Sequence, residues 1–333
     1  MRARASTETV IVTGGAGFIG SHLVDALLAD GRRVVAIDDL SRGDPDRVAA
    51  EADLETVDIT DGASLDRVID AARPAAIFHL AAQASVTASV ADPGHDCRVN
   101  VLGSVRVLEA AERHSAPIVF ASTGGALYGD DAPVPTPETC APSPLSPYGA
   151  SKLAAETYLT TWTRAGGPPH AICRLANIYG PRQSPDGEAG VVAIFSHLLS
   201  RGEAPTLYGF GAPMRDYVHV ADVVVALMAA RGHAGIFNVG SGVATDVATV
   251  LRELQSAAGT ALEPRCAPIR AGELMRSCLD PARARERLGW NAEIPLAEGL
   301  SVTYSSSADG SVGNMTGRVV RHQAAWFSQN GGA

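Results

Sequence analysis

The sequence predicts an α/β fold of the Rossmann type: a doubly wound parallel sheet of about seven strands, followed by a smaller, loop-rich C-terminal substrate domain. Three observations predict it. Short β-branched runs alternate with amphipathic stretches in the first half, a glycine-rich loop follows the first run, and Gly and Pro become frequent after Tyr179. Strands that alternate with helices form βαβ crossovers, which make the strands parallel and cover both faces of the sheet.

The expected strands are short runs rich in Val, Ile and Ala. They lie at 9–13, 33–37, 54–58, 76–80, 117–121 and 171–175, and a late run at 235–239 returns to complete the sheet. Amphipathic stretches between the runs predict helices over 18–28, 65–71, 99–112 and 151–162. Because each helix connects one strand to the next, we expect a parallel sheet that is buried on both faces.

The composition changes after Tyr179, and this change predicts the division into domains. Residues 180–190 and 204–215 are rich in Gly and Pro, and an apolar stretch between them predicts a helix over 191–200. We expect a first domain over 1–179 with a returning segment near 216–240, and a second domain over 180–215 and 241–333. The small, polar segment 305–317 predicts a flexible stretch before a short final helix over 319–328.

Composition and charge limit the functions that the chain can have. Of its 333 residues, 46% are hydrophobic and 19% are charged, which is typical of a globular protein, and the formal net charge is −9. This acidity is opposite to the basic patch that nucleic-acid binding needs. The longest apolar run, 223–230, is too short to cross a bilayer. Five scattered cysteines without a CxxC pair indicate reduced thiols, no metal site and a cytoplasmic location.

Lysine is almost absent from the chain. The 27 basic residues include one lysine, Lys152, and all the others are arginines. A GC-rich coding sequence accounts for the arginines, and one lysine can survive by chance. A lysine also offers a compact ammonium whose pKa shifts readily on burial, which an arginine does not. Composition alone leaves both interpretations open.

A glycine-rich loop predicts a site for a dinucleotide. The first expected strand runs directly into this loop, where Gly15, Gly17 and Gly20 form G-x-G-x-x-G and Gly14 extends the pattern. Glycines allow a tight turn and a close approach of the backbone to a pyrophosphate. The pyrophosphate would bind the free N–H groups of the helix that begins near Phe18.

Two aspartates, Asp38 and Asp39, follow the second expected strand about 20 residues after the loop. A carboxylate at this point accepts hydrogen bonds from the adenosine ribose hydroxyls and repels a 2′-phosphate, which favours NAD over NADP. Arg42 is a counter-signal, because an arginine can bind a 2′-phosphate. We expect the cofactor to be NAD.

A second motif, Y-x-x-x-K, predicts catalysis rather than binding alone. Tyr148 and Lys152 are four positions apart, so on a helix they share one face. A phenol of ordinary pKa is a poor base at neutral pH, and a nearby cation lowers that pKa by favouring the phenolate. We therefore expect Lys152 to tune Tyr148 as a general base.

Together these motifs resemble the extended short-chain dehydrogenase/reductase family, and within it the UDP-hexose 4-epimerases, over about residues 8–300. The matching segments are TGGAGFIGSHL at 13–23, DDLSRG at 38–43, HLAAQ at 79–83, Asn100, STGGALYGD at 122–130, SPYGASK at 146–152, RLANIYGPRQ at 174–183, RDYVHVADV at 215–223 and NVGSG at 238–242.

The resemblance implies roles for the catalytic residues. Tyr148 is implied as the general base and acid on the sugar 4-hydroxyl, and Lys152 as the residue that holds the nicotinamide ribose. Their hydroxyl partner is expected to be Thr123, with Ser122 in support. Relatives carry three hydroxyl residues in a row here, whereas this chain continues with Gly124 and Gly125. The identity of the hydroxyl therefore stays open between the two.

The resemblance also implies which residues bind the two ligands. For NAD they are Gly14, Gly17, Phe18, Ile19, Gly20, Asp38, Asp39, the adenine contacts Asp58 and Ile59, then Leu80, Ala81, Ala82, Gln83 and Asn100, together with Tyr148 and Lys152. For the nucleotide sugar they are Asn177, Val191, Arg215, Arg270, Glu273 and Ser277. Arg215 and Arg270 would clasp the diphosphate, for which bidentate pairing is suited.

The implied reaction is inversion at C4 of a UDP-sugar, UDP-glucose or UDP-galactose first, through a transient 4-keto intermediate. Ser277 stands where a bulky tyrosine excludes N-acetyl sugars in the family, so UDP-glucuronate and UDP-N-acetylglucosamine are alternative substrates. Related dehydratases and decarboxylases use a carboxylate in the stretch 123–127, which has none here. They rank lower, followed by a non-catalytic NAD-binding protein. The resemblance also implies a homodimer through helices near 99–112 and 151–162.

Overall fold

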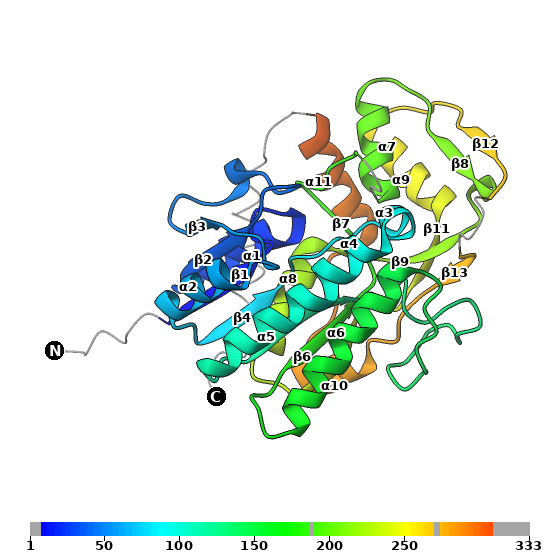
Figure 1. Ribbon diagram of the computed structural model, residues 1–333. Coiled ribbons are helices and arrows are strands. Elements are labelled where there is room, and N and C mark those ends of the chain that lie inside the picture. Colours follow the sequence, from blue (N-terminus) through cyan, green and yellow to red (C-terminus); the bar gives the residue numbers. More distant parts are fainter. Residues whose placement is uncertain (1–7, 187–189, 270–273, 309–333) are drawn as a thin grey trace.

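The computed structural model describes residues 8–186, 190–269 and 274–308. Its centre is a parallel sheet of seven strands in the order β10-β6-β5-β4-β1-β2-β3 (Figure 1). The predicted Rossmann-type sheet is confirmed, including the late strand that returns to its edge. The strands are β1 (Thr9–Thr13), β2 (Arg33–Asp38), β3 (Asp53–Thr56), β4 (Ala76–His79), β5 (Ile118–Thr123), β6 (Ala171–Leu175) and β10 (Gly235–Val239).

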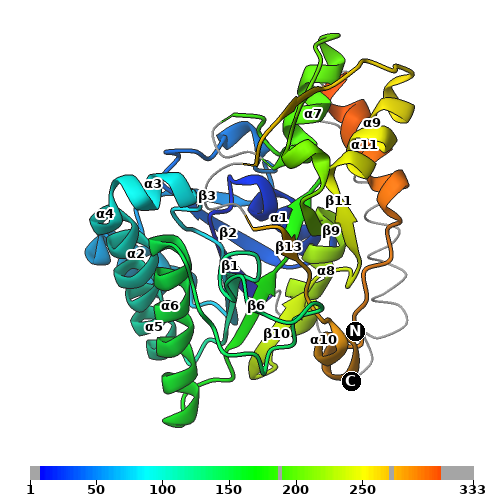
Figure 2. The same ribbon diagram turned by 90° about the vertical axis from the view of Figure 1, so that its right-hand side faces the viewer.

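Helices cover both faces of this sheet. Successive side chains of a strand point to opposite faces, and here both sets are apolar, so each face needs a helix layer to bury it. In β1, Val10 and Val12 enter the core on one face, and Ile11 enters the core on the other. Figure 2 shows the two helix layers on opposite sides of the strands. One layer contains α1 (Phe18–Ala29), α8 (Val220–Ala230) and α10 (Ala282–Leu288), and the other contains α2 (Gly62–Ala72), α5 (Ser104–Arg113) and α6 (Pro147–Arg164).

Two predicted helices differ from those in the structure. The segment expected at 99–112 divides into a π-helix, η2 (Arg98–Gly103), and α5, and two short helices precede it, α3 (Val86–Ala91) and α4 (Pro93–Cys97). The helix expected from 151 begins earlier, at Pro147, because Ser146 Oγ accepts a hydrogen bond from Gly149 N at 3.1 Å and caps its first turn. Tyr148 and Lys152 consequently lie on the same helix, α6.

A smaller group of elements lies beside one end of the sheet (Figure 2) and has a core of its own, in which Tyr179, Phe195, Leu251 and Leu300 are buried. Its helices are α7 (Val191–Ser200), α9 (Val247–Ala258) and α11 (Leu296–Ala308). Its strands are β7 (Asn177–Tyr179), β9 (Met214–His219), β11 (Ala244–Asp246) and β13 (Arg276–Ser277), with β8 (Thr206–Tyr208) paired to β12 (Arg265–Ala267). Short 3₁₀ turns, η1 (Pro45–Arg47) and η3 (Gly209–Gly211), complete the fold.

Two parts of the C-terminal third depart from expectation. The expected domain division assigned α10 to the second domain, whereas Ala284, Leu288 and Trp290 pack into the core under the large sheet. The flexible stretch expected from Ser305 is helical as far as Ala308, because α11 continues through it. The expected final helix, 319–328, lies outside the described residues.

No helix within the described ranges is long and apolar enough to cross a membrane. All five cysteines are in these ranges and are free.

Asp216 in β9 joins three segments of the smaller group. Its carboxylate is 1% exposed and accepts hydrogen bonds from Ser241 N at 2.7 Å, Gly242 N at 3.2 Å and Leu279 N at 3.2 Å. The Ser241 hydroxyl donates a further bond at 2.5 Å. The side chain therefore ties the loop after β10 and the segment after β13 to the strand that carries Arg215.

Replacing Asp216 with alanine removes the acceptor of three backbone N–H groups. Since an unsatisfied buried donor costs about 1 kcal/mol or more, we expect Asp216→Ala to lower the free energy of unfolding by about 3 kcal/mol in urea titrations. Asp131→Ala, which removes an exposed carboxylate, is the control and should change it by less than about 0.5 kcal/mol. If both variants lost the same free energy of unfolding, the stabilising role of the Asp216 hydrogen bonds would be contradicted.

Candidate active site

The glycine-rich loop lies where β1 ends, at the carboxyl edge of the sheet, and it leaves no room for side chains. Gly14 has a positive φ of 72°, and a Cβ there would lie 2.8 Å from Ala81 N. A Cβ on Gly20 would collide with Gly14 O, so the loop packs directly on the first turn of α1. That turn contains Phe18 and Ile19, has no side-chain cap and has no acidic residue. Its N–H groups are thus suited to bind an anion such as a pyrophosphate.

The two aspartates after β2 have different environments. Asp38 is 7% exposed, and its carboxylate accepts hydrogen bonds from Ala16 N and Leu40 N, both at 3.0 Å. Burial raises the pKa of Asp38, and the two N–H groups oppose that rise. Asp39 is exposed and accepts hydrogen bonds from Ser41 N and Ser41 Oγ. Asp38 therefore contacts the glycine loop, whereas Asp39 shapes only its own turn.

The loop after β4 forms the next wall of the site. Leu80 N and Ala81 N each donate a hydrogen bond to Thr13 Oγ1 at 3.2 Å, which joins this loop to the end of β1. Gln83 N donates to Asn100 Oδ1 at 2.9 Å, and Asn100 Nδ2 donates back to Gln83 O at 2.9 Å. Asn100 is 1% exposed, so it shapes the segment that includes Ala82 from beneath.

The two expected adenine contacts lie after β3 and face in different directions. Asp58 is exposed and accepts a hydrogen bond from Thr60 N at 2.8 Å. Ile59 is 5% exposed, belongs to one of the two cores of the sheet and packs against Gly103. Of the two side chains, Asp58 is thus the one that faces outward from the protein.

Tyr148 and Thr123 meet at the end of β5. Their hydroxyls are hydrogen-bonded, and Thr123 Oγ1 also accepts a bond from Ala126 N at 3.2 Å. Burial around the phenol raises the pKa of Tyr148 to about 12, against the effect of the Thr123 hydrogen bond. The expected lowering of the Tyr148 pKa by Lys152 is therefore not found: burial raises this pKa, and Lys152 does not contribute to the shift. Among the described residues, only the threonine hydroxyl acts to lower this pKa.

Lys152 lies one turn further along α6, 3% exposed, with its Nζ 4.4 Å from the centre of the Phe120 ring. A cation over an aromatic face is electrostatically favourable. Burial lowers the pKa of Lys152 to about 8, while the charges of Glu156 and Asp96 raise it. The ammonium therefore titrates near the physiological range.

Ser122, the alternative hydroxyl, points away from Tyr148 into a buried network. Its Oγ donates to Glu156 Oε1 at 2.5 Å. Glu156 also accepts a bidentate pair of bonds from Arg174, from Nε to Oε1 at 3.1 Å and from Nη2 to Oε2 at 2.6 Å. Arg174 Nη1 donates to the Tyr128 hydroxyl at 2.7 Å. The structure thus brings Thr123, and not Ser122, to Tyr148.

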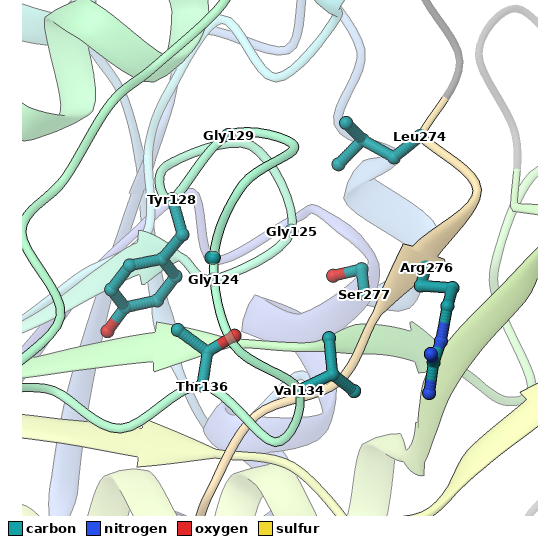
Figure 3. Close-up of a pocket in the computed structure, with 10 residues that line it drawn as sticks. Gly124, Gly125, Tyr128, Gly129, Val134, Thr136, Leu274, Arg276 and Ser277 are labelled. Atoms are coloured by element: carbon teal, nitrogen blue, oxygen red, sulfur yellow. The ribbon is translucent and has the colours of Figure 1, made fainter.

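A small pocket opens beside this group, between the loop after β5 and the strand β13. It is lined by Gly124, Gly125, Tyr128, Gly129, Ala132, Val134, Thr136, Leu274, Arg276 and Ser277. Figure 3 shows the Ser277 hydroxyl pointing toward the glycines, whereas the Arg276 side chain extends away from them. A Cβ on Gly125 would meet nothing closer than Asn177 Oδ1 at 3.9 Å, so Gly125 leaves open space.

The expected sugar-nucleotide contacts come from neighbouring strands of the small sheet. Ser277 pairs in register with Arg215, and Asn177 pairs with Tyr217 further along the same strand, β9. Val191 begins α7. Arg270 and Glu273 lie outside the described residues. Within the part of the chain that the structure describes, no cluster of His, Cys, Asp or Glu is arranged to hold a metal ion.

Two side chains lie at the site although no motif in the sequence indicates them. Arg276 lines the pocket next to Ser277, and only the position of β13 at the pocket edge reveals it. Asp96 is a buried acid on α4 whose charge acts on both Tyr148 and Lys152. It belongs to none of the motifs, because its place depends on how α4 packs against α6.

Known proteins share this sequence and fold. Residues 10–240 match the NAD dependent epimerase/dehydratase family. A UDP-glucose 4-epimerase of Mycolicibacterium smegmatis is 46% identical, covering 88% of this chain and 96% of that one. The structure of a UDP-glucose 4-epimerase of Thermotoga maritima with UDP-glucose is 42% identical with a TM-score of 0.89, covering 91% and 99% of the two chains. That of a Thermus thermophilus UDP-glucose 4-epimerase with NAD is 41% identical with a TM-score of 0.85, covering 91% and 100%.

The two aspartates after β2 offer a matched pair of variants. Asp38→Asn places an amide NH₂ where one carboxylate oxygen accepts a backbone N–H, which disturbs the glycine loop at a cost of roughly 1–3 kcal/mol. We expect NAD affinity, measured by calorimetry on cofactor-stripped protein, to fall about tenfold or more. Asp39→Asn removes the same charge at an exposed position and should change it less than about threefold. If Asp39→Asn lost more NAD affinity than Asp38→Asn, Asp39 would be the residue that binds the ribose.

Proposed function

The chain belongs to the NAD-dependent epimerase/dehydratase family, and from this membership we propose that it inverts C4 of a UDP-sugar, UDP-glucose and UDP-galactose first, through a transient 4-keto sugar. It is an enzyme of the extended short-chain dehydrogenase/reductase type, with NAD as its cofactor. The single observation that carries the proposal is the meeting of Thr123 with Tyr148, one turn from Lys152 on the same helix.

Each member of this group has one task. Tyr148 accepts the proton of the sugar 4-hydroxyl and later returns it to the same oxygen, after hydride has come back to the opposite face of C4. Thr123 donates a hydrogen bond that favours the phenolate, since it acts to lower the Tyr148 pKa. Lys152 adds a buried positive charge and three donors for the hydroxyls of a ribose. NAD, when bound, supplies the acceptor and the donor of the hydride.

The residues present fit NAD. The uncapped first turn of α1 faces the loop where Gly14 and Gly20 exclude side chains, as a pyrophosphate requires. Asp38 supplies a buried carboxylate beside that loop for a ribose. This chain thus holds the dinucleotide at the carboxyl edge of β1 and β2, where Rossmann folds bind it.

For the nucleotide sugar we propose Asn177, Arg215 and Arg270 at the diphosphate and Glu273 at the uridine ribose. Arg215 is partly buried and has its Nη1 bonded to Met214 O at 2.9 Å, so its guanidinium is held in place before substrate arrives. We place the sugar beside Gly125 and Ser277, which line the small pocket. Since neither position carries a bulky side chain, larger sugars such as UDP-N-acetylglucosamine and UDP-glucuronate are also substrates.

The assembly proposed is a homodimer. Leu102 on η2 and Tyr158 on α6 are each 43% exposed, although both are large and apolar or aromatic. The Tyr158 ring lies 6.1 Å from the ring of the half-buried Trp162, tilted by 50°. A second copy would cover these side chains.

Free thiols at all five cysteines suit a cytoplasmic enzyme.

Removing the Tyr148 hydroxyl should abolish turnover and leave NAD binding intact. Because general acid–base catalysis contributes at least about a hundredfold, we expect Tyr148→Phe to lower kcat for UDP-galactose by that factor or more, measured by coupled assay. Tyr304→Phe removes a phenolic hydroxyl from α11, away from the site, and should keep full activity. Turnover by Tyr148→Phe within a few-fold of wild type would refute the assignment.

A panel of nucleotide sugars, incubated without added NAD and separated by chromatography, tests substrate size. We expect interconversion of UDP-glucose with UDP-galactose and also turnover of UDP-N-acetylglucosamine. Ser277→Tyr fills the pocket, so the ratio of N-acetylated to plain sugar turnover should fall at least about tenfold, as a steric clash of 1–3 kcal/mol implies. Met275→Tyr, with the same bulk at an exposed neighbour, is the control. Rejection of every N-acetylated sugar by the wild type would contradict the open pocket.

A further inference from the structure

Asp96 is a buried acid for which the proposed reaction has no use. It lies on α4, is 1% exposed and makes no salt bridge with any described residue. Its Oδ1 accepts hydrogen bonds from Gln83 Nε2 at 2.9 Å and from Asn100 Nδ2 at 3.0 Å. Its Oδ2 is buried and finds no donor among the described residues. A buried carboxylate without a cation is costly, so its position calls for a reason.

The carboxylate is connected to the helix that carries Tyr148 and Lys152. Asn100 Nδ2, which donates to Asp96, also donates to Ser151 Oγ at 3.1 Å. Ser151 Oγ in turn donates to Tyr148 O at 3.0 Å. Asn100 lies in the π-helix η2, a rare conformation that is frequent at functional sites. Amide donors thus fix Asp96 relative to the first turns of α6.

Few other charges act near Lys152. On the same helix, the charge of Glu156 raises the pKa of Lys152 more than any other charge does. Its carboxylate, however, is already paired with Arg174 by bidentate bonds. On β4, burial together with the Lys152 charge lowers the pKa of His79 to about 3, so this side chain is neutral. The titratable groups close to Asp96 in the sequence are exposed: Asp92, His95, Cys97 and Arg98. Asp96 is therefore the buried carboxylate near Lys152 that no described arginine pairs, in contrast to Glu156.

We propose that Asp96 is a positioning residue for the proposed catalytic pair: held by Gln83 and Asn100, it supplies the fixed negative charge that keeps Lys152 an ammonium in the buried site. Its unbonded oxygen is buried and has no contact with solvent, so solvent does not screen that charge. The inference rests on the roles proposed for Tyr148 and Lys152.

The direction of the effect follows from the sign of the charge. A nearby anion stabilises an ammonium and destabilises a phenolate, so it raises the pKa of both groups. The Asp96 charge acts in this direction on Lys152, against the burial that lowers its pKa to about 8, and on Tyr148. Removing the charge should therefore move the pKa of Lys152 and that of Tyr148 downward together.

The single lysine makes this measurable without substrate. Tag-free, full-length protein labelled with ¹³C-lysine gives one ε-methylene signal, that of Lys152. We expect the wild-type signal to titrate near pH 8, and that of Asp96→Asn to titrate about one pH unit lower, a shift typical of one lost charge partner. The pH optimum of turnover should move downward in the same variant.

Glu109→Gln is the matched control, since it removes one carboxylate from the exposed face of the neighbouring α5. Its Lys152 signal should titrate with the wild type. If folded Asp96→Asn also titrates with the wild type, the proposal is overturned. Should that variant fail to fold, Asp96→Ser removes the charge with a smaller side chain and decides in the same way. Because the titration needs no substrate, a wild type without epimerase activity would refute the function and still leave the Asp96 question answerable.

Discussion

The site depends on one buried ion pair, Glu156 with Arg174. Both side chains are 2% exposed, and the pair joins α6 to β6, while Ser122 joins the same carboxylate to β5. Removing one partner of such a pair leaves an uncompensated buried charge, at a cost of about 3–5 kcal/mol. The helix with Tyr148 and Lys152 and the strand with Thr123 are therefore held at one relative position.

Burial has opposite consequences for the two titratable groups on that helix. It disfavours both charged forms, so it raises the pKa of Tyr148 to about 12 and lowers that of Lys152 to about 8. The Thr123 hydroxyl acts against the shift of Tyr148, and the charges of Glu156 and Asp96 act against the shift of Lys152, while the Asp96 charge adds to the rise of the Tyr148 pKa. The chemistry of the site is thus set by a few polar neighbours in a largely apolar surrounding, where each charge has a strong effect.

The proposed ligand contacts depend on the smaller group of elements holding a fixed position, as the large sheet does. Asp216 accepts hydrogen bonds from three backbone N–H groups in two other segments and lies next to Arg215 in β9. Ser277 and Asn177 are on strands that pair with β9, so their positions follow from the same ties. Pocket size is then decided by small residues, Gly125 and Ser277, on two segments far apart in the sequence.

The sequence by itself determined the seven strands of the large sheet, the four helices expected between them, the glycine loop and the Y-x-x-x-K pair, because periodicity and motif spacing are local properties of the chain. It left Thr123 and Ser122 open, and it missed Asp96, the π-helix and the packing of α10 on the large sheet. Only the tertiary structure decided these, since each depends on which distant segments come into contact. It also reversed the expected pKa of Tyr148, because burial is a property of the folded chain and not of a motif.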